Sequence, residues 1–446
     1  MKSSATSKKA MPNFSKAGYT ELKRRIVFVL MALLIFRLGV HIPIPGVDIV
    51  KIAAMFGKHK GGMLDMFNMF SGGALSKMSI FALGVFPYIT ASIIMQLLSN
   101  SAPSLMQLKK EGETGRRKIT QYTRYATVLF ALFQSFGIGK MLELQGAVTF
   151  SGMAFYVTTA VTLTTGVLFL MWLGEQITEK GIGNGISLII FSGIVSGLPN
   201  GIGSLFSQLK QGQIQFISFI MLVAIVFIIL SFIVFVERSQ RQITINYAKR
   251  QQGNKIYASK VSHLPLKVNI TGVIPPIFAF SLLSFPTTIA GFYANSSQYE
   301  WFNKITFWLS PGQPLYLIFL VSAIFFFAFF YAAMVFNPKD TADNLKKSGA
   351  LVPGIRPGKS TAEYIDKVMT KLTLIGAAYL AIVALIPDLL RSMWSISFYF
   401  GGTSLLIVVV VVMDFISQIQ SHLMSQKYES ILRKSKDKSD KLGLIR

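Results

Sequence analysis

The stretch PGIRPGKS, at residues 353–360, comes nearest in this sequence to a pattern that does chemistry. A phosphate-binding loop reads GxxxxGK followed by Ser or Thr, and its backbone N–H groups and lysine surround the phosphates. Here Pro353 stands where the first glycine is required. The residues therefore favour a turn in a basic loop, and they indicate no nucleotide-hydrolysing site within the chain.

Other catalytic and metal-binding patterns are missing from the sequence. HExxH, GxSxG and HxE do not occur. Cysteine is absent, which excludes disulfides, zinc–thiolate sites, iron–sulfur clusters and thiol nucleophiles. The four histidines are His41, His59, His263 and His422. We therefore expect no catalytic residue, no metal site and no cofactor, and we predict that the chain is not an enzyme.

Carboxylates inside apolar segments would be another source of chemistry, because ion-coupled transporters place charged residues within the membrane. Glu175, Glu237 and Asp388 lie at the ends of apolar runs, and Asp414 lies inside one. For Asp414, a helix-end position facing a neighbouring helix is favoured over a role in a proton relay. The spans thus indicate no ion pathway, although a secondary solute transporter with broken helices stays open as an alternative.

The elements that position these residues are predicted to be membrane-spanning helices. Of the 446 residues, 52% are hydrophobic and 14% are charged, whereas soluble domains are near 25% charged. A spanning helix needs about 20 mostly apolar residues. Ten such runs lie at about 22–40, 76–99, 122–140, 153–174, 184–205, 214–236, 269–294, 313–336, 371–392 and 398–420. The sequence therefore predicts an all-α polytopic membrane protein with ten transmembrane helices.

The basic residues orient these ten spans. The formal net charge is +25, from 44 Lys and Arg against 19 Asp and Glu. Thirty-five of the 44 basic residues lie in the two terminal segments and the even-numbered loops, and seven lie in the odd-numbered loops. Lys and Arg are retained on the cytoplasmic side during insertion. Both termini are therefore predicted to be cytoplasmic, and a charge that suggested nucleic-acid binding becomes a signal of topology.

The first outward loop contains an apolar segment that is too short to span. GGMLDMFNMFSGG, at residues 61–73, is rich in Met and Phe and is bracketed by glycine pairs. Its eight central residues reach only about 12 Å as a helix. We expect it to fold back into a cavity of the protein, with the glycines as hinges. A helix resting on the membrane surface is the alternative, but such helices carry a charged face.

Seven stretches in consistent order carry a resemblance to a known family. They are FNMFSGGALS (67–76), KKEGETGRRK (109–118), LGEQITEKGIGNGIS (173–187), NYAKRQQG (246–253), HLPLKVN (263–269), KSGALVPGIRPGKST (347–361) and FGGTSLLIVVVVVMDF (400–415). Together they resemble the SecY family, the channel subunits of the bacterial Sec protein-export translocon. The resemblance runs from about residue 20 to residue 430.

The resemblance implies two inverted five-helix halves around a central pore. The implied regions are a cytoplasmic N-terminal segment (1–21), an N-terminal half (22–205), a C-terminal half (206–425) and a cytoplasmic tail (426–446). Unfolded secretory proteins would cross through the pore, and membrane segments would leave sideways into lipid. That exit would lie between the second and third helices on one side and the seventh and eighth on the other.

The resemblance also assigns roles to particular residues. A ring of aliphatic side chains would close the pore, and its members would be Val85, Ile89, Ile186, Ile190, Ile277 and Ile407. Such a constriction gates by dewetting and prefers no particular sequence. The segment 61–73 would be the family's plug, with the central residues Met63, Leu64, Asp65, Met66, Phe67, Asn68, Met69 and Phe70. Here the resemblance agrees with the expectation drawn from length and polarity.

Two basic cytoplasmic loops, 237–268 and 337–371, match the family's docking loops for a motor or a ribosome. Lys249, Arg250 and Arg356 would make the contacts, and phosphate attraction suits a basic surface on ribosomal RNA. Gln242 and Asn254 stand where relatives often carry Arg. The implied partners are the SecE and SecG membrane subunits, the SecA ATPase, the ribosome, signal sequences, unfolded precursors and membrane lipids. The implied location is the bacterial cytoplasmic (inner) membrane.

Overall fold

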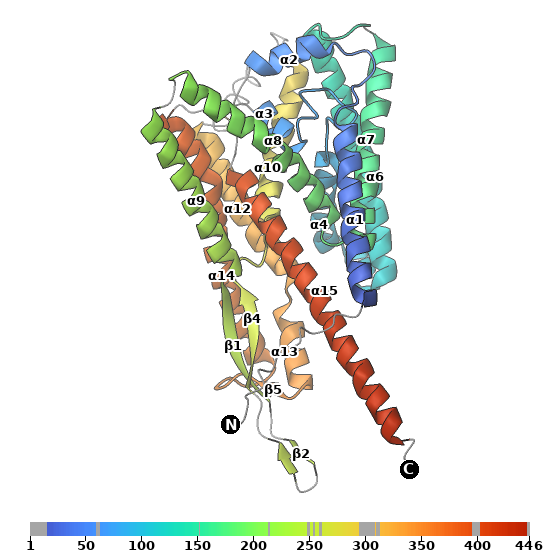
Figure 1. Ribbon diagram of the computed structural model, residues 1–446, viewed down its shortest axis with the longest axis vertical. Coiled ribbons are helices and arrows are strands. Elements are labelled where there is room, and N and C mark those ends of the chain that lie inside the picture. Colours follow the sequence, from blue (N-terminus) through green and yellow to red (C-terminus); the bar gives the residue numbers. More distant parts are fainter. Residues whose placement is uncertain are drawn as a thin grey trace, which may run out of the picture.

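The computed structural model is a long bundle of helices with a small sheet at one end (Figure 1). It describes residues 16–58, 63–150, 152–212, 215–247, 250–252, 255–257, 261–293, 308, 313–394 and 402–443. The first long helix begins at the same end of the bundle at which the last one finishes, and the strands lie at that end too.

Each of the ten apolar runs forms a helix, which confirms the predicted class of fold. These helices are α1 (Lys16–Gly39), α4 (Phe86–Ser101), α6 (Glu113–Leu144), α7 (Met153–Lys180), α8 (Gly185–Lys210), α9 (Phe216–Arg238), α10 (Ile274–Tyr293), α12 (Pro314–Val335), α14 (Lys359–Trp394) and α15 (Gly402–Gly443). Within the described residues, seven of them are long and apolar enough to cross a membrane: α6, α7, α8, α9, α12, α14 and α15.

Shorter helices occupy the connections between the long ones. They are α2 (Ile49–Lys58), α3 (Met63–Phe70), α5 (Pro103–Lys110) and α13 (Pro338–Lys347). The eight residues of α3 lie in the apolar segment of the first outward loop, and its length is too small for a crossing.

The second run differs from its prediction at its start. Residues 71–85 form turns, and the helix begins only at Phe86. Met78 and Gly84 have positive φ angles of 43° and 56°, which no right-handed helix accommodates. Pro87 follows in the first turn of α4, where its missing N–H costs no helical hydrogen bond. The first ten residues of this run are therefore an irregular, mostly buried segment rather than part of a span.

The loop 237–268, predicted only as a basic connection, folds into strands. β1 (Gln240–Tyr247) pairs antiparallel with β4 (Val261–Lys267), and β5 (Ala350–Leu351) adds to the other edge of β1. β2 (Arg250–Gln252) and β3 (Lys255–Tyr257) form a second pair. Ile243 and Ile245 are buried while Thr244 between them is exposed, as alternation along a strand requires. The sheet brings the two basic loops, 237–268 and 337–371, side by side.

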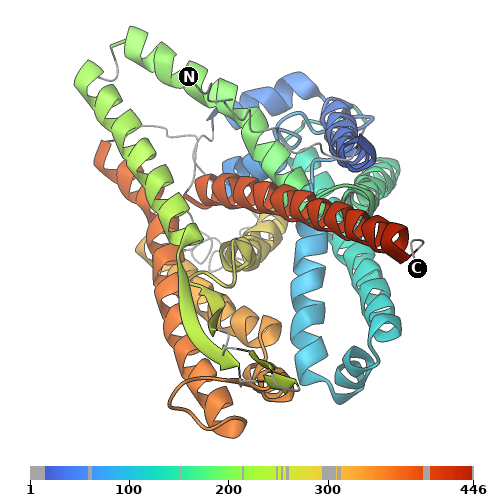
Figure 2. The ribbon, with the colours of Figure 1, turned by 60° about the horizontal axis from the view of Figure 1, so that its bottom comes forward.

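The long helices gather into two groups. α1, α4 and α6 to α8 pack on one another, as do α10, α12, α14 and α15. Figure 2, with the lower end of Figure 1 turned forward, shows α10 near the centre and α15 running between the groups. The groups meet where α10 contacts α4 and α6, and where α15 contacts α8. One large apolar core spans this junction.

Candidate functional site

The six aliphatic residues assigned to the ring all belong to, or pack against, the large apolar core that spans the junction of the two groups. Val85 directly precedes α4 and Ile89 lies in its first turn. Ile186 and Ile190 lie on α8, Ile277 on α10 and Ile407 on α15. Four of them are buried in the central core, and Ile186 and Ile277 are partly buried against it. Side chains more than 300 positions apart in the chain thus share one apolar core, and no polar atom among them offers a binding site for an ion.

Helix α3 lies against this core through two phenylalanines. The ring centroid of Phe67 is 4.7 Å from that of Phe86 and 5.8 Å from that of Phe280. The ring centroid of Phe70 is 5.8 Å from that of Phe86 and 5.0 Å from that of Phe280. Each such pair contributes about 0.5–1.5 kcal/mol beyond burial. Because Phe86 begins α4 and Phe280 belongs to α10, α3 contacts both groups of helices.

The turn after α3 is anchored by hydrogen bonds. The Oδ1 atom of Asn68 accepts from the backbone N–H of Ser76 at 2.8 Å, and its carbonyl accepts from Gly73 N–H at 2.7 Å. Arg37, at the end of α1, donates from Nη1 to the carbonyl of Gly72 at 2.8 Å. Arg37 was not assigned a role from the sequence. Its charge at the end of an apolar run was the available signal.

A close backbone approach holds the same turn against α8. A Cβ placed on Gly193 would lie 2.7 Å from the carbonyl oxygen of Phe70, so only glycine fits there. Of the plug residues, Phe67 is partly buried and Asn68, Met69 and Phe70 are buried. Met63, Leu64, Asp65 and Met66 belong to the same helix, and their side chains lie outside the described part of the structure.

A side-chain hydrogen bond joins α4 to α10 beside this core. The hydroxyl oxygens of Thr90 and Ser281 lie 2.8 Å apart. Thr90 also donates to the carbonyl of Phe86 at 3.1 Å. Either hydroxyl can donate in the contact between the two side chains. Sequence reasoning missed this contact, because a Thr and a Ser 191 residues apart carry no mutual pattern.

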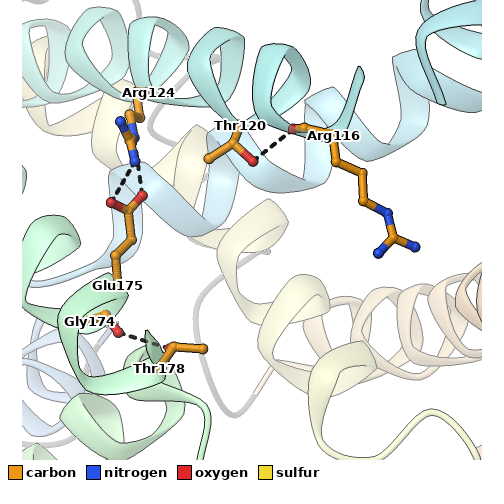
Figure 3. Close-up of polar contacts among 6 residues, drawn as sticks. All are labelled: Arg116, Thr120, Arg124, Gly174, Glu175 and Thr178. Carbon is orange, nitrogen blue, oxygen red and sulfur yellow. Dashed lines mark hydrogen bonds and ion pairs between the residues drawn. The ribbon is translucent and has the colours of Figure 1, made fainter. Parts of the chain in front are cut away.

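A large polar cavity lies between α6, α7 and the start of α8, close to Arg25 of α1, and the residues drawn in Figure 3 line part of its wall. Its volume is about 1150 Å³, and Ile186 of the aliphatic set lines it. Arg124 donates two hydrogen bonds to the carboxylate of Glu175, from Nε to Oε1 at 3.1 Å and from Nη2 to Oε2 at 2.7 Å. Both signs of charge line its wall: Arg25, Arg116, Arg117 and Arg124, with Glu113, Glu175 and Glu179.

The assigned docking residues are only partly within the described structure. Arg356 is exposed in a turn between Gly354 and Gly358, whose φ angles are 80° and 102°. Thr361 fixes that turn by donating to the carbonyl of Arg356 at 2.8 Å. Arg250 begins β2, and its side chain is outside the described residues, as is the whole of Lys249.

Of the two departures from the family pattern, one is described. Gln242 is exposed on β1 opposite Pro265, whereas Asn254 lies outside the described residues. Gln242 and Arg356 are thus both exposed on the connected loops of the sheet.

Comparison with known proteins gives consistent results. The SecY family model matches residues 79–416. The protein translocase subunit SecY of Escherichia coli (strain K12) is 57% identical over 425 residues, covering 94% of this chain and 96% of that protein.

Solved structures share the fold at lower identity. A protein-conducting channel superposes with a TM-score of 0.69 at 19% identity, covering 91% of this chain and 93% of the other. Sec61 in the canine ribosome–channel complex from the endoplasmic reticulum gives 0.65 at 17%, with the same coverage.

Proposed function

The chain belongs to the SecY family, so it is a channel subunit of a protein translocase, and we propose that proteins cross between its two groups of helices. It acts as a channel and not as an enzyme. The similarity to translocase subunits over nearly the whole chain favours this function over that of a solute transporter.

The observation that carries the proposed pathway is the meeting of six aliphatic side chains from α4, α8, α10 and α15 in one core. An aliphatic constriction excludes water and hydrated ions when closed. It makes no sequence-specific contact, so many different unfolded chains pass. The residues of the ring are Val85, Ile89, Ile186, Ile190, Ile277 and Ile407.

Helix α3 is the proposed plug of this pore at rest. Its phenylalanines lie against Phe86 and Phe280, on opposite sides of the junction. If α4 separates from α10, α3 therefore loses its aromatic contacts with one of the two helices. This arrangement supports a plug that leaves as the pore opens.

The two halves, residues 22–205 and 206–425, are the proposed moving parts. The contact between α4 and α10 lies on the proposed lateral exit, since α4 and α6 are the second and third long helices and α10 and α12 the seventh and eighth. The Thr90–Ser281 hydrogen bond crosses it. Breaking one such bond costs about 1 kcal/mol. Burial of the apolar side chains of a signal sequence between the separated helices offsets this cost.

We place the channel in the bacterial cytoplasmic membrane with both termini in the cytoplasm, because Lys and Arg concentrate in the terminal segments and even-numbered loops. The sheet of β1, β4 and β5 then faces the cytoplasm. We infer that it docks a ribosome, as befits a relative of the canine ribosome-bound channel, or the SecA ATPase. SecE and SecG are the proposed membrane partners.

A photocrosslinking side chain at Ile407 tests the pathway. Ile407 is fully buried at 0% exposure, so only a chain inside the pore reaches it. We expect adducts to a precursor stalled during export. Phe227, on the lipid-facing side of α9 with 72% exposure, is the control position, and it should give none. Absence of adducts at Ile407 during active export would refute the pathway.

A further inference from the structure

A carboxylate is buried at the end of α9, close to the sheet. Glu237 is 8% exposed, and its neighbours Asn269 and Thr271 are 3% and 5% exposed. Burial of a charge is costly unless hydrogen bonds satisfy it. The Nδ2 group of Asn269 donates to Oε1 of Glu237 at 2.6 Å. Such a group needs a structural or functional reason to be retained.

Asn269 lies where the strand pair returns to the bundle. Gln240, two residues after the end of α9, pairs with Lys267, and Val268 N–H donates to the carbonyl of Ser239 at 3.1 Å. The six residues from Val268 to Val273 connect β4 to α10. Any displacement of the strand pair relative to α9 acts first on this segment.

The side chain of Asn269 holds both ends of that connection. Its Nδ2 group also donates to the carbonyl of Gly272 at 3.2 Å, while its Oδ1 accepts from Thr271 Oγ1 at 3.1 Å. Gly272 has a φ of 61° and stands two residues before α10 begins. One amide thus ties the last turn of α9 to the turn that immediately precedes α10.

Helix α10 carries residues on which gating depends. Ile277 belongs to the aliphatic ring and lies in the first turn, and its N–H donates to the carbonyl of Val273. Ser281, one turn later, holds Thr90 of α4. A shift at Gly272 therefore reaches the ring after five residues and the lateral contact after nine.

Space for such a shift exists beside the pair. A cavity of about 240 Å³ is lined by Glu237 and Asn269 together with Lys267, Tyr331 and Asp414. The cavity lies between α9, the connecting segment, α12 and α15. Packed protein resists small displacements, whereas a lined cavity gives the connecting segment somewhere to move.

We propose that Asn269 and Glu237 are positioning residues that couple the docking sheet to α10, so that a ribosome bound at the sheet shifts the lateral contact. This coupling rests on the proposed function, since it assumes both docking and gating. With the pair intact, α9 and the connecting segment move as one unit. With the pair broken, the sheet moves without α10.

The test is a disulfide reporter across the lateral contact. Because the chain has no cysteine, Thr90→Cys and Ser281→Cys form a single possible disulfide. Its rate of formation is measured in the full translocon in membrane vesicles, with and without ribosomes lacking a nascent chain. Ribosome affinity is measured in parallel. We expect ribosomes to change the rate by on the order of fivefold or more.

Four variants separate coupling from docking. Asn269→Leu and Glu237→Leu should bind ribosomes like the parent, yet their disulfide rate should no longer respond. Glu237→Gln should keep the response, because its amide oxygen still accepts from Asn269. Asn200→Leu, at an exposed position on α8 and outside both docking loops, is the matched control and should respond like the parent.

The outcomes distinguish the inference from the function beneath it. A full response in Asn269→Leu with normal ribosome affinity overturns the coupling, as does ribosome binding that leaves the parent's rate unchanged. If the parent does not bind ribosomes at all, the proposed docking function is wrong, and the coupling falls with it.

Discussion

The hydroxyl oxygens of Thr90 on α4 and Ser281 on α10 lie 2.8 Å apart, across the contact between the two groups of helices. The phenylalanines of α3 contact the same two helices, at Phe86 and Phe280. A single separation of α4 from α10 would therefore break the polar contact and remove one side of the aromatic contacts of α3 at the same time. If α3 is the plug, as proposed, this geometry couples lateral opening to pore opening.

Replacing Thr90 with Val should make the lateral contact easier to open. The substitution keeps the shape and removes a hydrogen bond worth about 1 kcal/mol, which is roughly a fivefold shift toward the open state. We expect better export of a precursor whose signal sequence has been weakened. Thr158→Val is the control, since Thr158 bonds only to its own helix, at Ala154. Equal export by both variants would contradict the role of Thr90.

Removing the plug should raise the resting ion conductance. Deletion of residues 61–73 takes away α3, and Phe70→Ala alone removes a side chain that is 7% exposed. Truncation of a buried Phe costs about 3 kcal/mol or more, so the closed seat should be weakened in both cases. Conductance of the purified translocon in planar bilayers measures this. An unchanged leak in the deletion variant would demote α3 to a surface helix.

Gly193→Ala should displace the same plug from the opposite side. The added methyl group would lie 2.7 Å from the carbonyl oxygen of Phe70, so the turn after α3 must move. We expect increased resting conductance without loss of folding. Gly203→Ala lies on the same helix, and a Cβ there meets nothing within 4 Å. A leak that is the same in both alanine variants would show that the close approach does not hold the plug.

Arg356→Glu should reduce export while the protein still folds. Arg356 is exposed, so the reversal leaves the core untouched and acts on a partner. Lys339→Glu is the control, because it makes the same change of charge at an exposed position. A carboxylate in the first turn of α13 is compatible with the helix dipole, so this variant should also fold. Precursor translocation into vesicles should fall strongly for the first variant only. Normal export by Arg356→Glu would remove this residue from the docking surface.

Much of the architecture followed from local properties of the sequence. Apolar runs of the right length predicted ten helices, and each of them is present. The apolar segment 61–73 was predicted from its length alone to be too short to span a bilayer. The strands at 240–247 and 261–267 were not predicted, because short alternation such as ITIN is weak within a basic loop.

The tertiary structure decided which of these elements meet. Arg37 donates a hydrogen bond to Gly72, 35 residues away. Gly193 allows the close approach of Phe70, 123 residues away. Thr90 and Ser281 share a hydrogen bond across 191 residues. No periodicity in the chain records such contacts, because periodicity describes one face of one helix and not its neighbour. For the proposed aliphatic ring, only the family resemblance supplied the positions. The sequence by itself determined the spans, the side on which the charge lies and the short apolar helix. Packing alone determined the junction between the two groups of helices, since close approach is a property of two surfaces together.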